Sequence, residues 1–375
     1  MSVSKPRPSL SANSSSCGSA ATTLSYRNKV RNLTTSADST GKNNFGALYA
    51  LACVKYSTRL SHCVKISDKK NSVEITGDRM KADDWQAAME ALSNDTVTHH
   101  VLIKNRRHPD IIARSYDTLS SALSVPKNTS ASSTLYVVNT IAGCLCEMLS
   151  KSHALLCLEV ENIMFDCHAL KRLLTGISAN STLQHLSLAY CRLGDDDCVS
   201  LCRTLRDKPN VRSLDLTGCA LSPFAGKNGV VDLIKKQQVR RHEECWVHSL
   251  RSRSANPDAM QGLRRLTLNN NPTLGDNGVA DLLESLKDDF YVKAVDVQNC
   301  GLTDRGAQLA LSTLMVNNTL VVLDLRRNPN VSGSMLDTIM TRLYENNTDV
   351  EETKRWKWTK LRKDNAFKST SSSIR

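Results

Sequence analysis

The sequence predicts an elongated α/β solenoid on three observations: a short apolar motif that recurs, a near-constant spacing between its copies, and amphipathic segments between them. Six copies begin at residues 155, 183, 211, 263, 292 and 320. They read LLCLEVENIMF, LQHLSLAYCRL, VRSLDLTGCAL, LRRLTLNNNPTL, VKAVDVQNCGL and LVVLDLRRNPNV. All fit the pattern L-x-x-L-x-L-x-x-N/C-x-L, which is typical of the strand and turn of leucine-rich repeats.

The spacing of the copies predicts one helix after each strand. Successive motifs start 28, 28, 52, 29 and 28 residues apart, and a unit of 28–29 residues has room for a strand, a turn and a full helix. We therefore predict a right-handed solenoid of such repeats, with disordered tails. Its expected amphipathic helices cover Ala169–Ile177, Cys198–Leu205, Val279–Leu286, Ala307–Leu314 and Met335–Leu343.

Each strand is expected to point its leucines into the stack. Leu214, Leu216, Leu266 and Leu268 would pack on the equivalent side chains of the next repeat while the helix covers the other side. Fully burying one such side chain contributes about 1.5–3 kcal/mol. The turn positions should be buried and structural, with Cys as a small apolar group and Asn bonded to the backbone. These turn residues are Cys191, Cys219, Asn271, Cys300 and Asn328.

The region before the clear repeats predicts a cap. Ser72–Leu92 has the pattern of a degenerate strand and helix, and Asn44–Cys63 that of a capping helix. Residues 120–134 are rich in Ser and Thr and predict a loop, followed by a core helix over Leu135–Leu149. We thus expect a cap with degenerate repeats over 45–134 and a repeat domain over 135–350. Solenoids need such atypical terminal units to close their apolar ends.

The net charge of +12 comes mostly from the two ends of the chain. Residues 1–44 and 351–375 each carry a surplus of five positive charges, whereas the middle is nearly neutral. A folded nucleic-acid-binding domain is therefore not favoured. Residues 1–44 hold 16 Ser or Thr and few large apolar groups, so we expect them to be disordered. A mitochondrial transit peptide is the alternative for this segment. Residues 351–375 form a basic tail with interleaved aromatic residues.

The composition also bears on compartment. The chain contains no stretch of 18 apolar residues, so we expect no membrane span. It does not open with a basic segment followed by an apolar one, so we do not expect secretion. The 13 cysteines are then expected to be free thiols in a reducing compartment. A cytoplasmic protein is the prediction.

No catalytic constellation emerges from the motifs. The Gly-rich loops that cradle phosphates are absent from the sequence. His242, Cys245 and His248 could offer three zinc ligands on successive helical turns, but a fourth is missing. We accordingly predict a protein that is not an enzyme, with no catalytic, cofactor-binding or metal-binding residues, no cofactor and no small-molecule substrate.

Two regions are candidates for contact with a protein partner. The 52-residue spacing exceeds one repeat, and the excess lies at Arg240–Gly262. It is either an extended helix laid along the edge of the solenoid or a docking element, because insertions in repeats tend to cluster on a binding face. The other region is the concave strand face, where alternation is expected to expose a mixed-charge stripe. The predicted contact residues are Arg241, His242, Glu243, Glu244 and Trp246 in the insertion, and Asp215, Arg265, Asp296, Asp324 and Arg326 on the strands.

These motifs resemble the leucine-rich region of the 78-kilodalton centrosomal protein family. The resemblance rests on VRRHEECWVHSLRSR and GLRRLTLNNN around the insertion, then NCGLTDRGA and NNTLVVLDLRRNP, with weaker support from ITGDRMKADDW and FGALYALACV. It covers about residues 45–350 and implies a horseshoe like that of ribonuclease inhibitor. It also implies a protein of centrioles and basal bodies with ubiquitin-ligase components and centriolar kinases as partners. Family members usually carry a C-terminal coiled coil as well.

We therefore expect a non-catalytic scaffold or adaptor of the centriole, basal body or flagellar base that supports cilium assembly. One alternative is a cytosolic or nuclear regulator of an enzyme, such as a ubiquitin ligase or small GTPase. The other is binding of nucleic acid or membrane through the basic tails.

Overall fold

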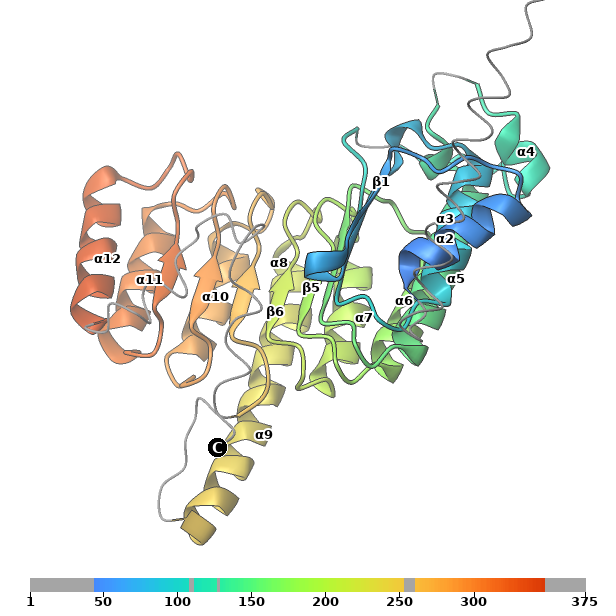
Figure 1. The fold of residues 1–375 in the computed structure, drawn as a ribbon. Coiled ribbons are helices and arrows are strands. Elements are labelled where there is room, and N and C mark those ends of the chain that lie inside the picture. Colours follow the sequence, from blue (N-terminus) through green and yellow to red (C-terminus); the bar gives the residue numbers. More distant parts are fainter. Residues whose placement is uncertain (1–43, 108–110, 127–128, 253–259, 348–375) are drawn as a thin grey trace, which may run out of the picture.

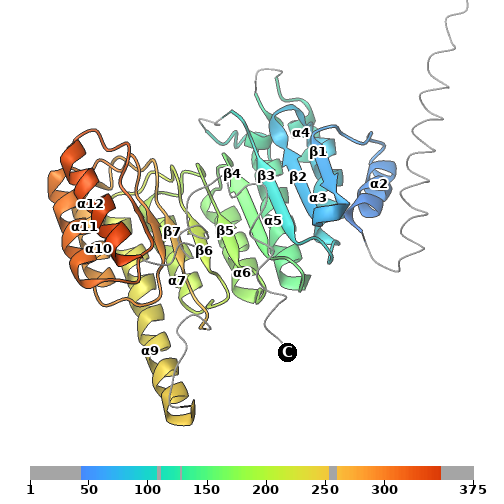
Figure 2. The ribbon, with the colours of Figure 1, turned by 60° about the vertical axis from the view of Figure 1, so that its left-hand side comes forward.

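The described residues form one continuous sheet in which the strands follow chain order. A computed structural model describes residues 44–107, 111–126, 129–252 and 260–347. In these ranges nine strands run side by side from β1 to β9, and the helices form a second layer along the row (Figures 1 and 2). The strands are β1 (Val64–Ser67), β2 (Ser72–Thr76), β3 (His100–Lys104), β4 (Cys157–Glu161), β5 (His185–Ser187), β6 (Ser213–Asp215), β7 (Arg265–Thr267), β8 (Ala294–Asp296) and β9 (Val322–Asp324).

The helical layer contains one helix or helical segment for each repeat. The α-helices are α2 (Phe45–Lys55), α3 (Ala82–Ser93), α4 (Leu119–Leu123), α5 (Leu135–Lys151), α6 (Cys167–Ala179), α7 (Gly194–Arg206), α8 (Pro223–Ala225), α9 (Asp232–Ser252), α10 (Gly275–Leu286), α11 (Asp304–Val316) and α12 (Gly333–Asn346). Short 3-10 helices are η1 (Asp68–Lys70), η2 (Gly77–Arg79) and η3 (Ala131–Ser133), and η4 (Gly226–Val231) is a π-helix. Within the described ranges, no helix combines the length and apolarity that a bilayer crossing requires.

The strand pairing aligns one apolar column through the whole sheet. From β2 to β9 every pair is parallel, and the register joins the second residue of each strand to the second residue of the next. The column comprises Val73, Val101, Leu158, Leu186, Leu214, Leu266, Val295 and Leu323, and all eight side chains are buried in the core. Leu216 and Leu268 are also buried, so the predicted facing of the strands is confirmed.

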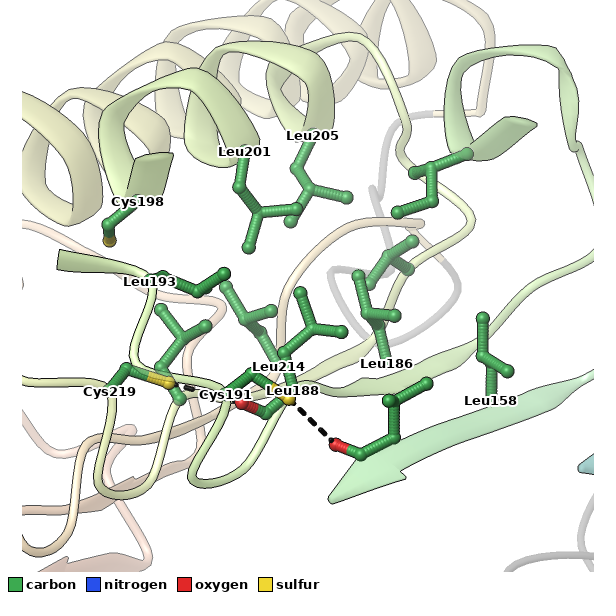
Figure 3. Close-up of a cluster of buried hydrophobic side chains, with 14 of the residues drawn as sticks. Leu158, Leu186, Leu188, Cys191, Leu193, Cys198, Leu201, Leu205, Leu214 and Cys219 are labelled. Carbon is green, nitrogen blue, oxygen red and sulfur yellow. Dashed lines mark hydrogen bonds between the residues drawn. The ribbon is translucent and has the colours of Figure 1, made fainter. Parts of the chain in front are cut away.

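The helices close the other side of this column. Each of the five predicted amphipathic segments lies within an observed helix: α6, α7, α10, α11 or α12. Figure 3 shows Leu201 and Leu205 of α7 directed toward the strand leucines Leu186 and Leu214. The leucine spacing of i and i+4 places both on one face of the helix, which is why this face packs against the sheet.

The turn positions behave as the motif predicts. Cys191 and Cys219 are buried, and their thiols donate to the carbonyl oxygens of Val160 and Leu188 in the preceding repeat, at 3.4 and 3.1 Å (Figure 3). Asn271 is buried as well, and its amide donates across the repeat boundary to the carbonyl oxygen of Leu216. Turn residues therefore link each repeat to the one before it, as a small thiol or as an amide that satisfies the backbone.

The cap differs from its prediction in two places. The capping helix α2 ends at Lys55, and β1 follows after Cys63 and pairs antiparallel with β2. The strand β3 was not predicted, because its sequence HVLIK carries no repeat motif. The predicted strand and helix within Ser72–Leu92 are confirmed as β2 and α3, and the core helix after residue 134 as α5. The predicted loop over 120–134 contains part of α4 and all of η3.

Several predictions fall on residues that the structure does not describe. The expected disordered tail over 1–44 lies outside the described residues except for Asn44, whose side chain caps α2 by accepting a hydrogen bond from the Gly46 amide. The basic tail over 351–375 and residues 253–259 of the insertion also lie outside them. The twelve cysteines within the described ranges are all free.

Candidate functional site

The concave face of the sheet, formed by the residues that flank the buried column, is polar but largely closed. Arg265 and Asp296 form an ion pair at 2.7 Å, and Thr267 donates to the same carboxylate at 3.2 Å. Arg265 is 4% exposed and Asp296 is fully buried. Burial raises the pKa of Asp296, and the neighbouring Arg265 charge opposes that shift. These side chains thus bond to one another across β7 and β8.

The same arrangement continues into the last strand. Gln298 donates to Asp324 at 2.8 Å, and the guanidinium of Arg326 contacts the same carboxylate. Asp324 is buried, whereas the side chain of Arg326 points outward and remains exposed. The hydrogen bond to Asp324 raises the pKa of Arg326.

The predicted exposure of the concave stripe is therefore wrong for three of its five contact residues. Arg265, Asp296 and Asp324 are buried, whereas Asp215 is half-buried and Arg326 is exposed. The alternation along each strand was correct, but parallel strands bring polar side chains of neighbouring repeats close enough to bond laterally, which removes them from solvent. The accessible part of this face is smaller than the sequence predicted.

The base of helix α9 is built into the solenoid. Arg241 is 2% exposed, and its guanidinium donates to the carbonyl oxygens of Gln261 and Leu263 at 2.9 and 2.7 Å. It also stacks over the ring of Tyr291, 4.6 Å from the centroid. Burial lowers the pKa of Arg241 to about 10. The prediction that Arg241 contacts a partner is corrected: its side chain holds the end of the insertion against the start of β7.

Two further residues, Gln237 and Gly262, shape this anchor, the contact of α9 with the residues that lead into β7. Gln237 donates to the carbonyl oxygen of Leu205 and accepts a hydrogen bond from the amide of Leu263. Gly262 has φ of +117°, and a Cβ there would lie 2.3 Å from a guanidinium nitrogen of Arg241. Only glycine fits both the backbone angle and the space at this position.

Beyond this anchor, α9 leaves the body of the molecule. Figures 1 and 2 show its outer end projecting away from the repeat stack, so the expectation of a helix laid along the edge is wrong. We call Glu243–Leu250 the α9 projection. Trp246 and Leu250 are 66% and 67% exposed, and Glu243, which precedes them in the helix, is exposed as well. Glu244 pairs with Arg240 at 3.3 Å.

His242 marks the boundary between anchor and projection. Its ring lies 6.3 Å from that of Phe290 and 5.9 Å from that of Tyr291, and the side chain is otherwise exposed. Of the five residues predicted in the insertion, the structure thus places Glu243, Glu244 and Trp246 together on the projection. His242 lies at its start and Arg241 lies inside the body.

A third arrangement, which the sequence did not single out, lies at the other end of the concave face. His100, Cys157 and Glu159 bring a nitrogen, a sulfur and an oxygen within 4.8 Å of one another. Burial and the Glu159 charge raise the pKa of Cys157. His100 lies on β3, which has no repeat motif. Cys157 and Glu159 lie within a repeat motif, which by itself accounted for their presence in the sequence. A search for His and Cys at equal offsets in successive strands would have found them.

Comparison with known proteins first defines the class. A family model described as "Leucine Rich repeat" matches residues 179–202. The mouse ribonuclease inhibitor is 25% identical over 200 residues, which are 50% of this chain and 43% of that protein. Together with the in-register parallel sheet and its helical layer, these matches define a leucine-rich-repeat protein.

Longer matches identify the family. The centrosomal protein of 78 kDa from Mus musculus is 31% identical over 319 residues, which cover 84% of this chain and 40% of the mouse protein. The protein of the same name from Homo sapiens is 31% identical over 314 residues, with 84% and 45% covered. The resemblance stated from the sequence is confirmed: in its repeat region, this chain is a homologue of the 78-kilodalton centrosomal proteins. It spans less than half of the length of these relatives.

Proposed function

We propose that this chain is a non-catalytic protein-interaction adaptor of the centrosome that acts at the centriole, basal body or flagellar base and supports cilium assembly. The names of its homologues support the location. The architecture supports the adaptor role, because a stacked repeat body offers a rigid support for an exposed docking element. Ubiquitin-ligase components and centriolar kinases are the partners that the family resemblance suggests.

We further propose that the repeats form a right-handed horseshoe of 28–29-residue units, capped by residues 45–134. The parallel pairing of Cys157 with His185 and of His185 with Ser213, each 28 residues further along, supports that unit length. Strand–helix–parallel strand connections are right-handed in nearly all proteins, which supports the handedness.

The observation that carries the adaptor proposal is the apolar stripe on α9. Val239, Trp246 and Leu250 are all more than half exposed and are spaced by seven and four residues. At 3.6 residues per turn, this spacing places them on one face of the helix. In the described part of the chain, more than half of the surface of each of these side chains is left uncovered. A partner with an apolar groove that accepts one amphipathic helix fits such a stripe.

The polar residues of the projection would set the orientation of the bound partner rather than its affinity. Glu243 lies within the stripe and Glu244 about 100° further around the helix, so the partner's groove should carry a basic residue at its rim. Exposed charges of this kind contribute mainly to the rate and specificity of association. The half-buried Asp215 and exposed Arg326 on the concave face are second candidates for the same role.

The test is a pair of matched substitutions in the full chain, tagged at its natural level in its own cells. Trp246→Asp with Leu250→Asp should abolish capture of proximity-labelled partners and lower the signal beside a centriole marker. Met340→Asp with Tyr344→Asp, at exposed positions of α12, is the control and should change neither. The docking role is wrong if the α9 double variant, folded by circular dichroism, retains every partner of the unsubstituted chain.

The location and the docking role fail separately in this design. A diffuse signal from the unsubstituted chain would contradict the centrosomal location. A centriolar signal that the α9 double variant keeps, together with all its partners, would contradict only the docking role.

A further inference from the structure

The N-terminal half of the concave face brings three metal-ligating side chains together from two neighbouring strands. His100 on β3 is the register partner of Cys157 on β4, and Glu159 follows two residues later on the same face of β4. The imidazole Nε2 of His100 lies 3.2 Å from a carboxylate oxygen of Glu159. The thiol of Cys157 lies 3.6 Å from the same oxygen. All three ligand atoms lie within 4.8 Å of one another.

These separations are close to those around a tetrahedral zinc ion. Zinc binds nitrogen and oxygen at about 2.0–2.2 Å and thiolate sulfur at about 2.3 Å, so tetrahedral ligand atoms lie about 3.3–3.8 Å apart. The nitrogen–oxygen and sulfur–oxygen separations of 3.2 and 3.6 Å already correspond to that geometry. The remaining pair, the His100 nitrogen and the Cys157 sulfur, needs at most a small side-chain rotation to reach it.

The surroundings of the cluster favour a ligand role over a simple ion pair. The Nε2 atom of His100 is buried and makes no hydrogen bond within the described part of the chain, although the carboxylate lies nearby. Cys157 is 8% exposed and faces the concave side, whereas its neighbour Leu158 points into the core. An ion pair between His100 and Glu159 would involve only two of the three side chains, whereas the Cys157 thiol contacts the same carboxylate oxygen at 3.6 Å.

We propose that His100, Cys157 and Glu159 form a Zn²⁺ site on the concave face. A mixed set of imidazole, thiolate and carboxylate suits zinc, whereas magnesium and calcium prefer oxygen ligands alone. Three protein ligands leave the fourth position to water. In the described part of the chain, no other group of three such ligand atoms lies this close together.

The site would connect the cap to the regular repeats. β3 belongs to the cap and β4 begins the first clear repeat, with a 52-residue connection between the two strands. A metal held by both strands stabilises the folded state by an amount that grows with the logarithm of its concentration over its dissociation constant, because the unfolded chain offers no preformed site. Metal binding should therefore raise the temperature at which the junction of β3 and β4 unfolds.

The experiment uses the full chain after chelator treatment, with Co²⁺ as a spectroscopic probe and Zn²⁺ as competitor. One equivalent of Co²⁺ should produce a thiolate-to-cobalt charge-transfer band, and one equivalent of Zn²⁺ should remove the band and raise Tm. Cys157→Ser should abolish the band. His100→Asn and Glu159→Gln both keep the thiol, and each should weaken Zn²⁺ binding at least tenfold.

Cys146→Ser is the matched control, because Cys146 is a partly exposed cysteine of α5, outside the cluster. It should retain the band and the affinity of the unsubstituted chain. A missing band in the unsubstituted chain, or a band that persists in Cys157→Ser, would overturn the proposal. If Cys157→Ser fails to fold, the His100 and Glu159 variants decide, and unchanged Zn²⁺ affinity in both would overturn it equally.

Discussion

The repeat body and the α9 projection differ in which side chains they bury. In the body, even a carboxylate such as Asp296 is buried, because Arg265 and Thr267 of the neighbouring strand β7 supply partners for it. On the projection, even the indole of Trp246 is mostly exposed, because no repeat stacks on either side of that part of the helix. Burial in this protein thus follows from having a neighbouring repeat and depends less on the polarity of the side chain.

The contrast also appears within a single helix. Arg240 and Arg241 are adjacent in α9, yet Arg240 forms only an exposed pair with Glu244, whereas Arg241 is enclosed by the carbonyl groups that lead into β7. Comparing matched substitutions in the two regions measures how much stability the stacking contributes.

The largest effect is expected for a charge placed in the leucine column. Leu268→Asp should reduce the free energy of unfolding by about 5 kcal/mol or more, because it buries an unpaired carboxylate and removes apolar contacts. Leu250→Asp, the same substitution on the projection, should change it by less than about 0.5 kcal/mol. Urea unfolding followed by circular dichroism measures both. Similar losses for the two variants would mean that the projection packs as tightly as the body.

A smaller effect is expected for the buried ion pair. Asp296→Ala should cost about 3–5 kcal/mol, because it leaves the buried Arg265 without the carboxylate that now faces it at 2.7 Å. Glu244→Ala removes the partner of Arg240 in an exposed pair and should cost less than about 0.5 kcal/mol. The comparison is measured by the urea midpoint at constant pH and salt. Equal midpoints would contradict the interpretation that the concave network stabilises the stack.

The adjacent arginines of α9 provide the third pair. Arg241→Gln should destabilise the protein by about 2 kcal/mol, because two charge-assisted hydrogen bonds to carbonyl oxygens are lost. Arg240→Gln should have almost no effect, since that side chain is exposed. Hydrogen exchange of β7 amides should increase only in the Arg241 variant. Increased exchange in both variants would mean that Arg240, as well as Arg241, helps to hold α9 against β7.

The smallest perturbation is chemical labelling of the cysteines, which requires no substitution. Burial raises the pKa of Cys300 to about 11, so near pH 8 only about one thiol in a thousand is ionised. Alkylation of Cys300 should be slow below that pKa and should accelerate as pH rises toward it. Cys167 is exposed and should react first. Mass spectrometry of labelled peptides gives both rates, and fast labelling of Cys300 in the folded protein would contradict its burial in the turn.

Much of the repeat body was predictable because its signals are local and periodic. The L-x-x-L-x-L motif identified β4 to β9, the facing of Leu214 and Leu266, and the buried turn residues Cys219 and Asn271. β3 was not predictable in this way. Its residues become a strand through parallel pairing with β2 and β4, which come from distant parts of the sequence.

The candidate contact residues were harder to assign. Sequence spacing placed Arg265, Asp296 and Asp324 on the correct face, but it carried no information on the lateral bonds that bury them. Likewise, the excess of residues between β6 and β7 predicted an insertion, whereas the direction of α9 depends on where Arg241 and Gln237 find carbonyl groups to bond.

The sequence by itself determined the fold class, the strand facing and the family, because all three depend on residue types at fixed spacings. Only the tertiary structure decided which polar groups remain exposed, where α9 projects and that His100 lies beside Cys157 and Glu159. The physical reason is that the exposure of a side chain, and the set of side chains that it meets, depend on contacts between repeats. These contacts join residues that are far apart in the sequence, and no local pattern marks them as neighbours.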